Sequence, residues 1–246
     1  MFKFQATDNS LQGKTILVTG AGAGIGKSAA IHYAKYGATV ILLGRTVKKL
    51  EQVYDEIINA GYPEPAIIPL DMKGATAQHY KDMVSTITDQ FPSLDGALLN
   101  ASILGELTPF IQINAQTFDD VMQVNLKAQM QLAQALIPAM IKSDSASLIF
   151  TTSGVGNQGR AFWGPYSMSK FATEGMMQII ADEYEGSNLR TNAINPGGTK
   201  TGMRASAFPA EDKSVLPEAD DIMPLYLYLM SDDSKAINGQ RLNAQT

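Results

Sequence analysis

Cysteine is absent from the 246 residues, and histidine occurs only twice, at His32 and His79. Without cysteine, the protein has no thiol nucleophile, no disulfide bond and no cysteine-ligated metal site. The two histidines lie on expected helices and lack the spacing of metal ligands, so no metal site is predicted. The net charge is −5 and no run of basic residues stands out. A nucleic-acid partner is therefore not expected.

Long hydrophobic runs are also absent. No stretch of about 18 consecutive apolar residues occurs, and the beginning, "MFKFQATDNSLQGK", lacks the apolar core of a signal peptide. Hydrophobic residues nevertheless make up 45% of the sequence, which is ordinary for a globular protein with a buried core. We expect a cytoplasmic protein, an enzyme or a binding protein, that makes no membrane contact.

Short apolar runs alternate with longer amphipathic segments along the whole sequence. The runs are rich in valine, isoleucine, leucine and threonine, which is typical of parallel strands buried on both faces. Six strands are expected in these runs: Thr15–Gly20, Ala38–Gly44, Ala66–Asp71, Asp95–Asn100, Ala146–Ser153 and Leu189–Asn195. A last strand is expected within "NGQRLNAQT".

Segments of helix length separate the expected strands. They are Ile25–Tyr36, Val47–Ala60, Ala75–Gln90, Phe118–Lys142 and Tyr166–Glu185. The alternation of strand and helix predicts βαβ units, and hence an α/β fold. Specifically, we expect a single Rossmann-type doubly wound parallel sheet flanked by helices on both faces. No linker rich in proline, glycine or serine interrupts the pattern, so residues 1–246 are expected to form one domain.

A glycine-rich turn, "TGAGAGIG", follows the first expected strand. Glycine at positions 20, 24 and 26 allows the backbone to approach a ligand closely, and the next helix offers free N–H groups to a pyrophosphate. The position between a strand and a helix predicts a dinucleotide site. Methyltransferases also use a glycine-rich first turn, so the turn alone leaves the chemistry open.

Arg45 follows the second expected strand, where the adenosine ribose of a dinucleotide should lie. NAD-binding proteins usually have an acidic residue there that holds the 2′-hydroxyl, whereas this sequence has Gly44 and Arg45. A guanidinium group suits a 2′-phosphate. The predicted cofactor is therefore NADP(H), with NAD(H) less favoured. The alternative is that Arg45 is a solvated charge at the start of a helix.

Together with further motifs, these features resemble the short-chain dehydrogenases/reductases from Leu11 to Thr246. In the family's order, the motifs are "TGAGAGIG", "LDM", "LDGALLNAS", "VMQVNLKA", "IFTTSG", "YSMSK" and "NPGGTKT". A narrower resemblance, to the bacterial YciK-type oxidoreductases, is carried by "QGRAFWGPYSMSKFATEGMMQ", "NPGGTKTGMRASAFPAED" and "DIMPLYLYLMSDDS". Two departures from the family pattern stand out: Ser102 replaces a usual glycine, and the last strand lacks the usual Asp-Gly-Gly.

The resemblance implies two sets of site residues. The catalytic set is Asn125, Ser153, Tyr166 and Lys170. The cofactor-binding set is Gly20, Gly24, Ile25, Gly26, Arg45, Asp71, Asn100, Ala101, Tyr166, Lys170, Pro196, Gly197, Thr199 and Thr201. The resemblance also implies a cofactor-binding and catalytic core over residues 11–197 and a substrate lid over residues 198–221.

Tyr166 and Lys170 are four residues apart, so they share one face of the expected helix. Reduction of a carbonyl group needs a proton donor at its oxygen, and a free tyrosine has a pKa of about 10. A cation one turn away is expected to lower the pKa of Tyr166 by stabilising the phenolate. The resemblance adds that Lys170 binds the nicotinamide ribose, that Ser153 orients the substrate oxygen, and that Asn125 kinks its helix and holds a water.

The predicted function is an NADP-dependent oxidoreductase that interconverts a carbonyl and an alcohol on a small molecule. The alternative is a catalytically weak NADP(H)-binding sensor or scaffold, which the two departures from the family pattern favour. A methyltransferase would not need the catalytic set.

Three bulky residues of the lid, Met203, Phe208 and Leu216, are candidate substrate contacts. Phe162 and Trp163 either wall the pocket or pack beneath a loop. Two long helices, Phe118–Lys142 and Tyr166–Glu185, resemble those that pair across symmetry axes in the family. A homodimer or homotetramer is therefore expected. Met176, Met177, Ile179 and Ile180 could add apolar contacts to it; the alternative is that these side chains all face their own core.

Overall fold

Seven parallel strands form one sheet within residues 1–245, the part of the chain that the computed structural model describes. Their order in the sheet is β3-β2-β1-β4-β5-β6-β7. The strands are β1 (Thr15–Thr19), β2 (Thr39–Gly44), β3 (Ala66–Pro69), β4 (Gly96–Leu99), β5 (Ala146–Thr151), β6 (Leu189–Asn195) and β7 (Arg241–Asn243). The predicted α/β fold with a doubly wound parallel sheet is confirmed.

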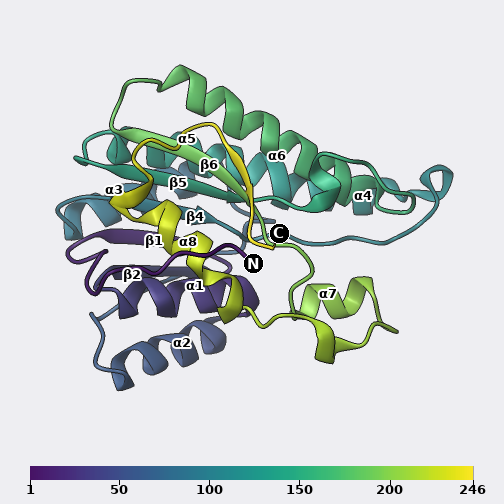
Figure 1. The fold of residues 1–246 in the computed structure, drawn as a ribbon. Coiled ribbons are helices and arrows are strands. Elements are labelled where there is room, and N and C mark those ends of the chain that lie inside the picture. The colour runs from purple at the N-terminus through teal and green to yellow at the C-terminus, as the bar shows by residue number, and fades with distance from the viewer. Residues whose placement is uncertain (246) are drawn as a thin grey trace.

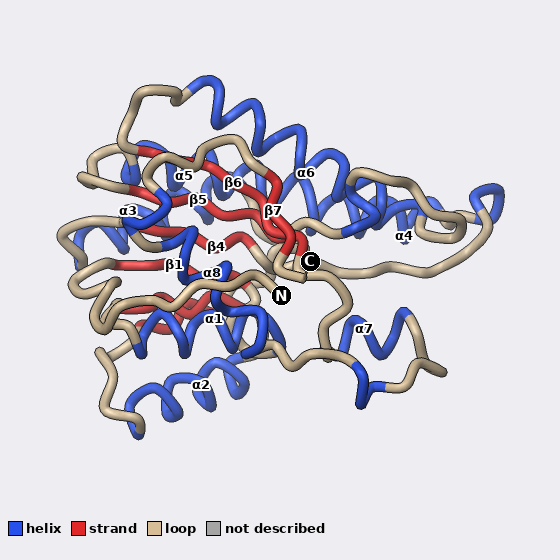
Figure 2. Tube along the Cα trace, in the orientation of Figure 1, coloured by secondary structure: helices blue, strands red, loops and turns tan. Residues whose placement is uncertain are grey.

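Helices cover both faces of the sheet (Figures 1 and 2). They are α1 (Gly24–Lys35), α2 (Val47–Asn59), α3 (Ala77–Gln90), α4 (Ala115–Met122), α5 (Ala128–Met140), α6 (Gly164–Glu183), α7 (Gly202–Ala207) and α8 (Met223–Met230). No helix among residues 1–245 is both long and apolar enough to cross a membrane.

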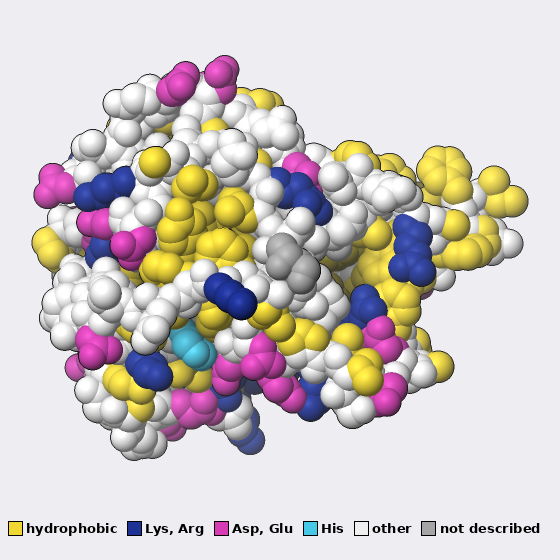
Figure 3. All heavy atoms as spheres, in the orientation of Figure 1, with side chains coloured by type: hydrophobic (Ala, Val, Ile, Leu, Met, Phe, Trp, Pro, Cys, Tyr) yellow, Lys and Arg dark blue, Asp and Glu magenta, His cyan; other side chains and the backbone are white. Residues whose placement is uncertain are grey.

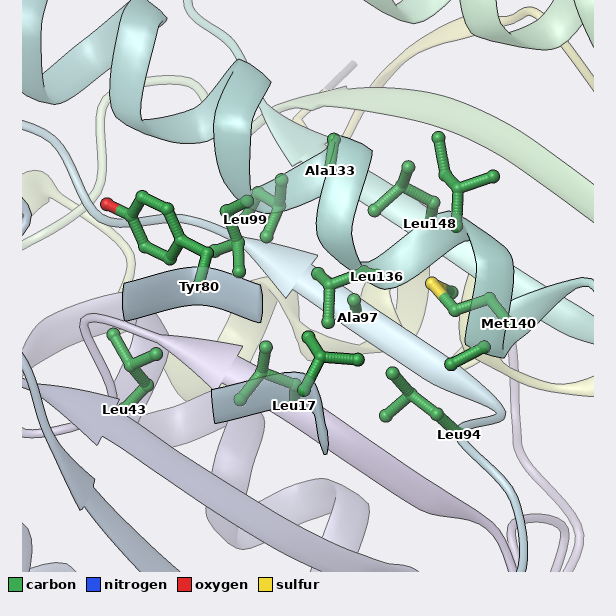
Figure 4. Packing of buried hydrophobic residues seen from close by; sticks show 14 of the residues in the cluster. Leu17, Leu43, Tyr80, Leu94, Ala97, Leu99, Ala133, Leu136, Met140 and Leu148 are labelled. Atoms are coloured by element: carbon green, nitrogen blue, oxygen red, sulfur yellow. The ribbon is translucent and has the colours of Figure 1, made fainter. Parts of the chain in front are cut away.

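Two hydrophobic cores lie on opposite faces of the sheet. One core joins the sheet to α1, α2 and α8, with Tyr33, Leu50 and Tyr226 fully or almost fully buried. The other joins it to α3, α5 and α6, and Figure 4 shows Tyr80 and Leu136 among its members. Because both faces are covered, the central strands β1, β2 and β4 are almost continuously apolar, which explains why short apolar runs predicted them correctly.

The helix expected over Phe118–Lys142 is interrupted in the structure. A π-helical turn, Gln123–Lys127, separates α4 from α5 and contains Asn125. Helix α8 was not expected as a helix. It has the sequence "MPLYLYLM" and packs six buried side chains into the core beside α1. A helix that is apolar on all sides shows no period of 3.6 residues, so the usual sequence signal was missing.

Two of the four apolar side chains expected at a subunit contact belong to the core instead. Met177 is fully buried, and Ile180 is 7% exposed. Met176 is partly buried against the same core. Only Ile179, which is 59% exposed, faces outward. For Met177 and Ile180 the alternative of a core position therefore holds, because both lie on the side of α6 that covers the sheet.

The order of the strands in the sheet determines where the ligand site lies. The chain moves outward from β1 to β2 and β3 on one side, and β4 then pairs with the other side of β1. In an open parallel sheet, a ligand binds at the carboxyl ends of the strands where this reversal occurs. The loops after β1, β4, β5 and β6 meet at that edge and line one cavity.

Candidate functional site

The turn after β1 is a close-packed backbone cradle. A Cβ atom on Gly26 would lie 2.3 Å from the carbonyl oxygen of Gly20, so only glycine fits there. Gly20 itself has a φ of 69°, a conformation that favours glycine. Helix α1 begins at Gly24 and directs its N-terminus toward the cavity, which Gly20, Gly24 and Ile25 line. The cradle therefore fits the pyrophosphate of a dinucleotide.

The hydroxyl group of Thr19 ties the ends of β1 and β4 together. Its oxygen accepts hydrogen bonds from the backbone nitrogens of Asn100 at 2.9 Å and Ala101 at 3.0 Å. The Asn100 side chain in turn accepts a hydrogen bond from Thr151 at 3.2 Å, at the end of β5. Three strand ends are thus fixed side by side along the wall of the cavity.

Arg45 lies beyond β2, next to the glycine turn. Thr19 pairs with Leu43, and the backbone nitrogen of Ala21 donates to the Leu43 carbonyl oxygen at 3.2 Å. The Arg45 side chain is exposed, and it makes no hydrogen bond or ion pair with any residue in the range 1–245. Its five donors are therefore available to a ligand.

Asp71 follows β3, at the same edge of the sheet. Its carboxylate accepts a hydrogen bond from the backbone nitrogen of Lys73 at 3.0 Å. Because the Leu70 nitrogen donates to the Gly44 carbonyl at 3.0 Å, the ends of β2 and β3 lie together. Asp71 and Arg45 therefore stand on adjacent strand ends, outside the cavity.

Tyr166 and Ser153 line a cavity of about 340 Å³. Ser153 follows β5 and Tyr166 belongs to the first turn of α6, which begins with Gly164 and Pro165. The side chains of Ser153 and Ser102 lie close enough to the Tyr166 hydroxyl to act on its pKa. Lys170 lies behind the tyrosine, with its Nζ atom 5.6 Å from the ring centre, and does not line the cavity.

Burial dominates the acid–base properties of this pair. Tyr166 is 7% exposed, and burial raises its pKa to about 12, although the hydroxyl groups of Ser153 and Ser102 act in the opposite direction. Lys170 is fully buried, and burial lowers its pKa to about 8. The expected lowering of the tyrosine pKa is therefore not found, because loss of solvent around the phenol outweighs the two serine hydroxyl groups that lower it.

Lys170 donates a hydrogen bond from Nζ to the carbonyl oxygen of Thr151 at 2.7 Å. This bond satisfies one of its three donors and fixes the ammonium group between α6 and the end of β5. Gly156 permits the close packing, since a Cβ atom there would lie 3.1 Å from Cβ of Lys170.

Asn125 holds the loop that follows β4. Its side-chain oxygen accepts from the Ile103 backbone nitrogen at 2.8 Å, and its side-chain nitrogen donates to the Ile103 carbonyl at 2.9 Å. The same nitrogen reaches the Ser169 hydroxyl at 3.1 Å. Asn125 is fully buried and does not line the cavity, so its side chain acts on the loop and not directly on a substrate.

The segment after β6 closes the cavity on the side opposite α6. Pro196, Gly197, Thr199 and Thr201 all line it. Thr201 caps α7 by accepting from the Arg204 backbone nitrogen at 3.1 Å, and its methyl group would lie 3.3 Å from a Cβ on Gly24. The start of the lid thus touches the glycine turn.

Aromatic side chains connect the lid to the start of α6. The Trp163 ring lies 5.9 Å from Tyr166 and 5.7 Å from Phe208 of the lid, measured between ring centres. Trp163 and Met203 line the cavity, whereas Phe162 is 55% exposed and Phe208 does not reach the lining. Figure 3 shows the surface hollowed between the lobe of α7 and a protruding lobe rich in hydrophobic side chains.

Most predicted site residues gather at this cavity. Gly26, Asn125 and Lys170 lie directly behind its walls, and Arg45 and Asp71 lie beyond one end. No cluster of three or more histidine or acidic residues that could hold a metal occurs among residues 1–245.

Sequence reasoning did not identify three residues that shape the site. Ser102 was noted as a departure from the family pattern, but not as a partner of Tyr166. Arg241 donates to Glu174 at 2.8 Å and to the Ser153 carbonyl at 3.3 Å. Gln245 contacts the segment after β6. The one signal in the sequence was that the last strand lacks the usual Asp-Gly-Gly. This departure drew attention to the last strand, but it did not show which residues Arg241 and Gln245 contact.

Comparison with known proteins agrees with this geometry. The family model described as short chain dehydrogenase matches residues 14–212. The oxidoreductase YciK of Escherichia coli (strain K12) is 52% identical over 242 residues, which cover 98% of this chain and 96% of that protein.

Solved structures of short chain dehydrogenases are equally similar. The one from Shigella flexneri 2a, complexed with NADP, has a TM-score of 0.96 and 51% identity, covering 98% of this chain and all of that chain. The one from Escherichia coli CFT073, complexed with NADPH, has a TM-score of 0.95 and 51% identity, with the same coverage. Sequence motifs, sheet topology and relatives agree that this chain belongs to the short-chain dehydrogenase family of oxidoreductases.

Proposed function

We propose that this protein is an NADP-dependent oxidoreductase that reduces a carbonyl group on a small molecule to an alcohol, and can catalyse the reverse reaction. The observation that carries the proposal is the cavity itself. A protonated tyrosine and a serine hydroxyl line it together with the glycine cradle that fits a pyrophosphate.

Tyr166 is the proton donor of the proposed reaction. When bound, the reduced cofactor supplies a hydride to the carbonyl carbon. The Tyr166 hydroxyl gives its proton to the carbonyl oxygen, and the alcohol is complete. Because the pKa of Tyr166 is raised to about 12, the phenol carries this proton throughout the neutral range. Ser153 donates a hydrogen bond to the same oxygen and holds it beside the phenol.

Lys170 stabilises the phenolate that the transfer leaves behind. Its ammonium group is fully buried, so its charge acts through a medium that screens little. With a pKa lowered to about 8, Lys170 also passes protons readily near neutral pH. The lysine thus stabilises the transition state, in which negative charge develops on the tyrosine oxygen.

The cofactor is NADP(H) in this proposal. The Gly20–Gly26 turn fits a pyrophosphate, and the unpartnered Arg45 guanidinium lies at the adjacent strand end, where a 2′-phosphate would be placed. The complexes of the Shigella flexneri and Escherichia coli relatives with NADP and NADPH support this choice.

The substrate proposed for this site is uncharged near its carbonyl group. Besides the hydroxyl groups, the cavity is lined by the large apolar side chains of Leu104, Trp163 and Met203. The one cation in the lining, Arg204, is bound by the Glu211 carboxylate and lies 3.9 Å over the Phe208 ring. Apolar aldehydes and ketones are therefore favoured over keto acids.

The test is turnover with a panel of aldehydes, ketones and quinones, followed as NADPH consumption. Tyr166→Phe is expected to abolish reduction while the dissociation constant of NADPH stays nearly unchanged, because only the proton donor is lost. Lys170→Ala should impair both reduction and NADPH binding. Tyr184→Phe, at the far end of α6, is the control and should impair neither reduction nor NADPH binding. Equal loss of NADPH binding in the Tyr166 and Lys170 variants would contradict this division of roles.

The alternative function is a nucleotide-binding sensor or scaffold. Ser102, at the position of a usual family glycine, is the observation that favours it. Tight NADPH binding without turnover of any member of the panel would support the alternative and contradict the enzyme proposal.

A further inference from the structure

Gln245 places its side-chain amide against the segment Pro196–Thr199. Its Nε2 atom lies 2.8 Å from the Pro196 carbonyl oxygen and 3.0 Å from the Gly198 carbonyl oxygen. The Thr199 hydroxyl lies 3.2 Å from the same nitrogen. This side chain therefore bridges both ends of a segment that lines the cavity.

The chemistry of the contact determines which amide atom faces the segment. Both backbone carbonyl groups can only accept hydrogen bonds, and the amide nitrogen has two hydrogens to donate. The amide oxygen in that position would face two other oxygens, so the opposite orientation is excluded. Within residues 1–245, the Gly198 carbonyl accepts no hydrogen bond other than the one from Gln245.

The backbone that carries Gln245 is itself fixed. Strand β7 pairs with β6, and the nitrogen of the next residue, Ala244, donates to the Asn195 carbonyl at 2.9 Å. Ala244 is 1% exposed, and its own carbonyl accepts from the Phe2 nitrogen at 2.9 Å. Gln245 therefore extends from a buried anchor.

Gly197 is shaped to receive this side chain. It has a φ of 74°, which favours glycine. A Cβ atom on Gly197 would lie 2.8 Å from Cδ of Gln245, so a larger residue would displace the amide. The backbone conformation of Gly197 and its lack of a Cβ atom therefore both suit the position of the Gln245 amide.

Pro196, Gly197 and Thr199 line the same cavity as Tyr166, beside which the proposed hydride transfer requires the nicotinamide to lie. We infer that Gln245 is a positioning residue that holds Pro196–Thr199 in the conformation that closes over this nicotinamide end of the cofactor. The inference rests on the proposed NADP(H) site. Without the amide, the Gly198 carbonyl loses its partner and the two glycines of the segment are free to reorient. The cofactor must then order the segment when it binds, which weakens binding at that end only.

The experiment compares two ligands. Gln245→Met keeps the length of the side chain but has no donor. NADPH carries a nicotinamide, whereas 2′-phospho-ADP-ribose shares the remainder of the molecule without it. We expect Gln245→Met to weaken NADPH binding on the order of tenfold and to leave the dissociation constant of 2′-phospho-ADP-ribose unchanged, both measured by calorimetry. Gln240→Met is the control, since this exposed side chain bonds only to the Asn238 carbonyl.

Hydrogen exchange of the cofactor-free proteins provides a second measurement. The amides of residues 197–199 should exchange faster in Gln245→Met than in the wild type or in Gln240→Met. The inference is wrong, and the proposed function stands, if wild type and Gln245→Met bind NADPH equally well. The same conclusion follows if Gln245→Met weakens the binding of NADPH and of 2′-phospho-ADP-ribose by the same factor. If wild type does not bind NADPH, the proposed function is wrong, and the inference fails with it.

Discussion

Arg45 provides the most direct test of cofactor choice at the scale of a single residue. Its guanidinium is exposed and has no partner among residues 1–245. A charge-assisted hydrogen bond contributes about 1.5–3 kcal/mol, so Arg45→Ala should weaken NADPH binding roughly 10- to 100-fold. NADH lacks the 2′-phosphate and should bind equally well to both proteins. Adding Gly44→Asp should reverse the preference, because its carboxylate repels the phosphate and accepts from a 2′-hydroxyl.

Dissociation constants of NADPH and NADH at a fixed ionic strength decide this prediction. Lys35→Ala, which removes an exposed positive charge at the opposite end of α1, is the control. If Arg45→Ala weakens both cofactors equally, Arg45 is only a solvated charge at a helix start.

Burial of Lys170 makes stability depend on pH. Its pKa falls from 10.5 to about 8 in the folded protein, so between these values the unfolded chain binds more protons. The free energy of unfolding therefore rises with pH over this range, and the full cost of burial is present below pH 8. We expect Lys170→Met to be more stable than wild type at pH 7 by on the order of 3 kcal/mol.

This difference should shrink as the pH rises from about 8 to 10.5. Urea unfolding followed by circular dichroism at several pH values measures it for both proteins. A stability difference that is constant across this range would mean that the pKa of Lys170 is not lowered in the folded protein.

At the scale of secondary-structure elements, one ion pair ties β7 to α6 and to the end of β5. Arg241 donates to the Glu174 carboxylate at 2.8 Å, and Thr152 donates to the same oxygen at 2.7 Å. Since Glu174 is 8% exposed, Arg241→Gln leaves a buried charge without its cation. We expect this change to lower the free energy of unfolding by about 3 kcal/mol.

A double variant, Glu174→Gln with Arg241→Gln, should be less destabilised than Arg241→Gln alone, because no unpaired charge remains. The exposed pair of Lys73 and Asp120 serves as comparison, and Lys73→Gln should cost less than about 1 kcal/mol. The single variant Glu174→Gln completes the comparison. If the destabilisation of the double variant equals the sum of the two single effects, Glu174 and Arg241 do not depend on each other.

The same elements show what a sequence can predict. The six strands expected from apolar runs agree with the structure to within two residues at each end, because burial on both faces determines their composition. The break in the helix at Asn125 was not predictable as a π-helical turn, since it depends on bonds to Ile103, 22 residues earlier. The family resemblance placed Ser153 and Tyr166 in one site, and both line the same cavity in the structure. The sequence could not show the direction of the tyrosine pKa shift, which packing determines.

At the scale of the whole molecule, α6 presents an apolar stripe to solvent. Met168, Phe171 and Ile179 are 36%, 44% and 59% exposed, and their spacing places them on one face of the helix. Gly175 lies between them on that face and permits close approach of another backbone. Exposed apolar stripes of this kind mark contacts between proteins, so a homodimer or homotetramer remains our prediction.

Ile179→Glu should shift the mass measured by light scattering at micromolar concentration toward that of a monomer, because a carboxylate would be buried at the contact. Val215→Glu, in the lid and 73% exposed in the wild type, should leave the mass unchanged. A monomeric wild-type protein would refute the prediction outright.

Strand β7 and Gln245 also set an order of events during synthesis on the ribosome. The sheet from β3 to β6 and the glycine turn are translated before residue 241, yet the segment over the nicotinamide end gains its partner only when Gln245 has emerged. Asn195 likewise forms its hydrogen bonds with Asn243 and Ala244 only after these residues have been translated. A nascent chain that does not yet include residue 245 can thus form most of the sheet while the Gly198 carbonyl lacks its partner, and closure of the site requires Gln245.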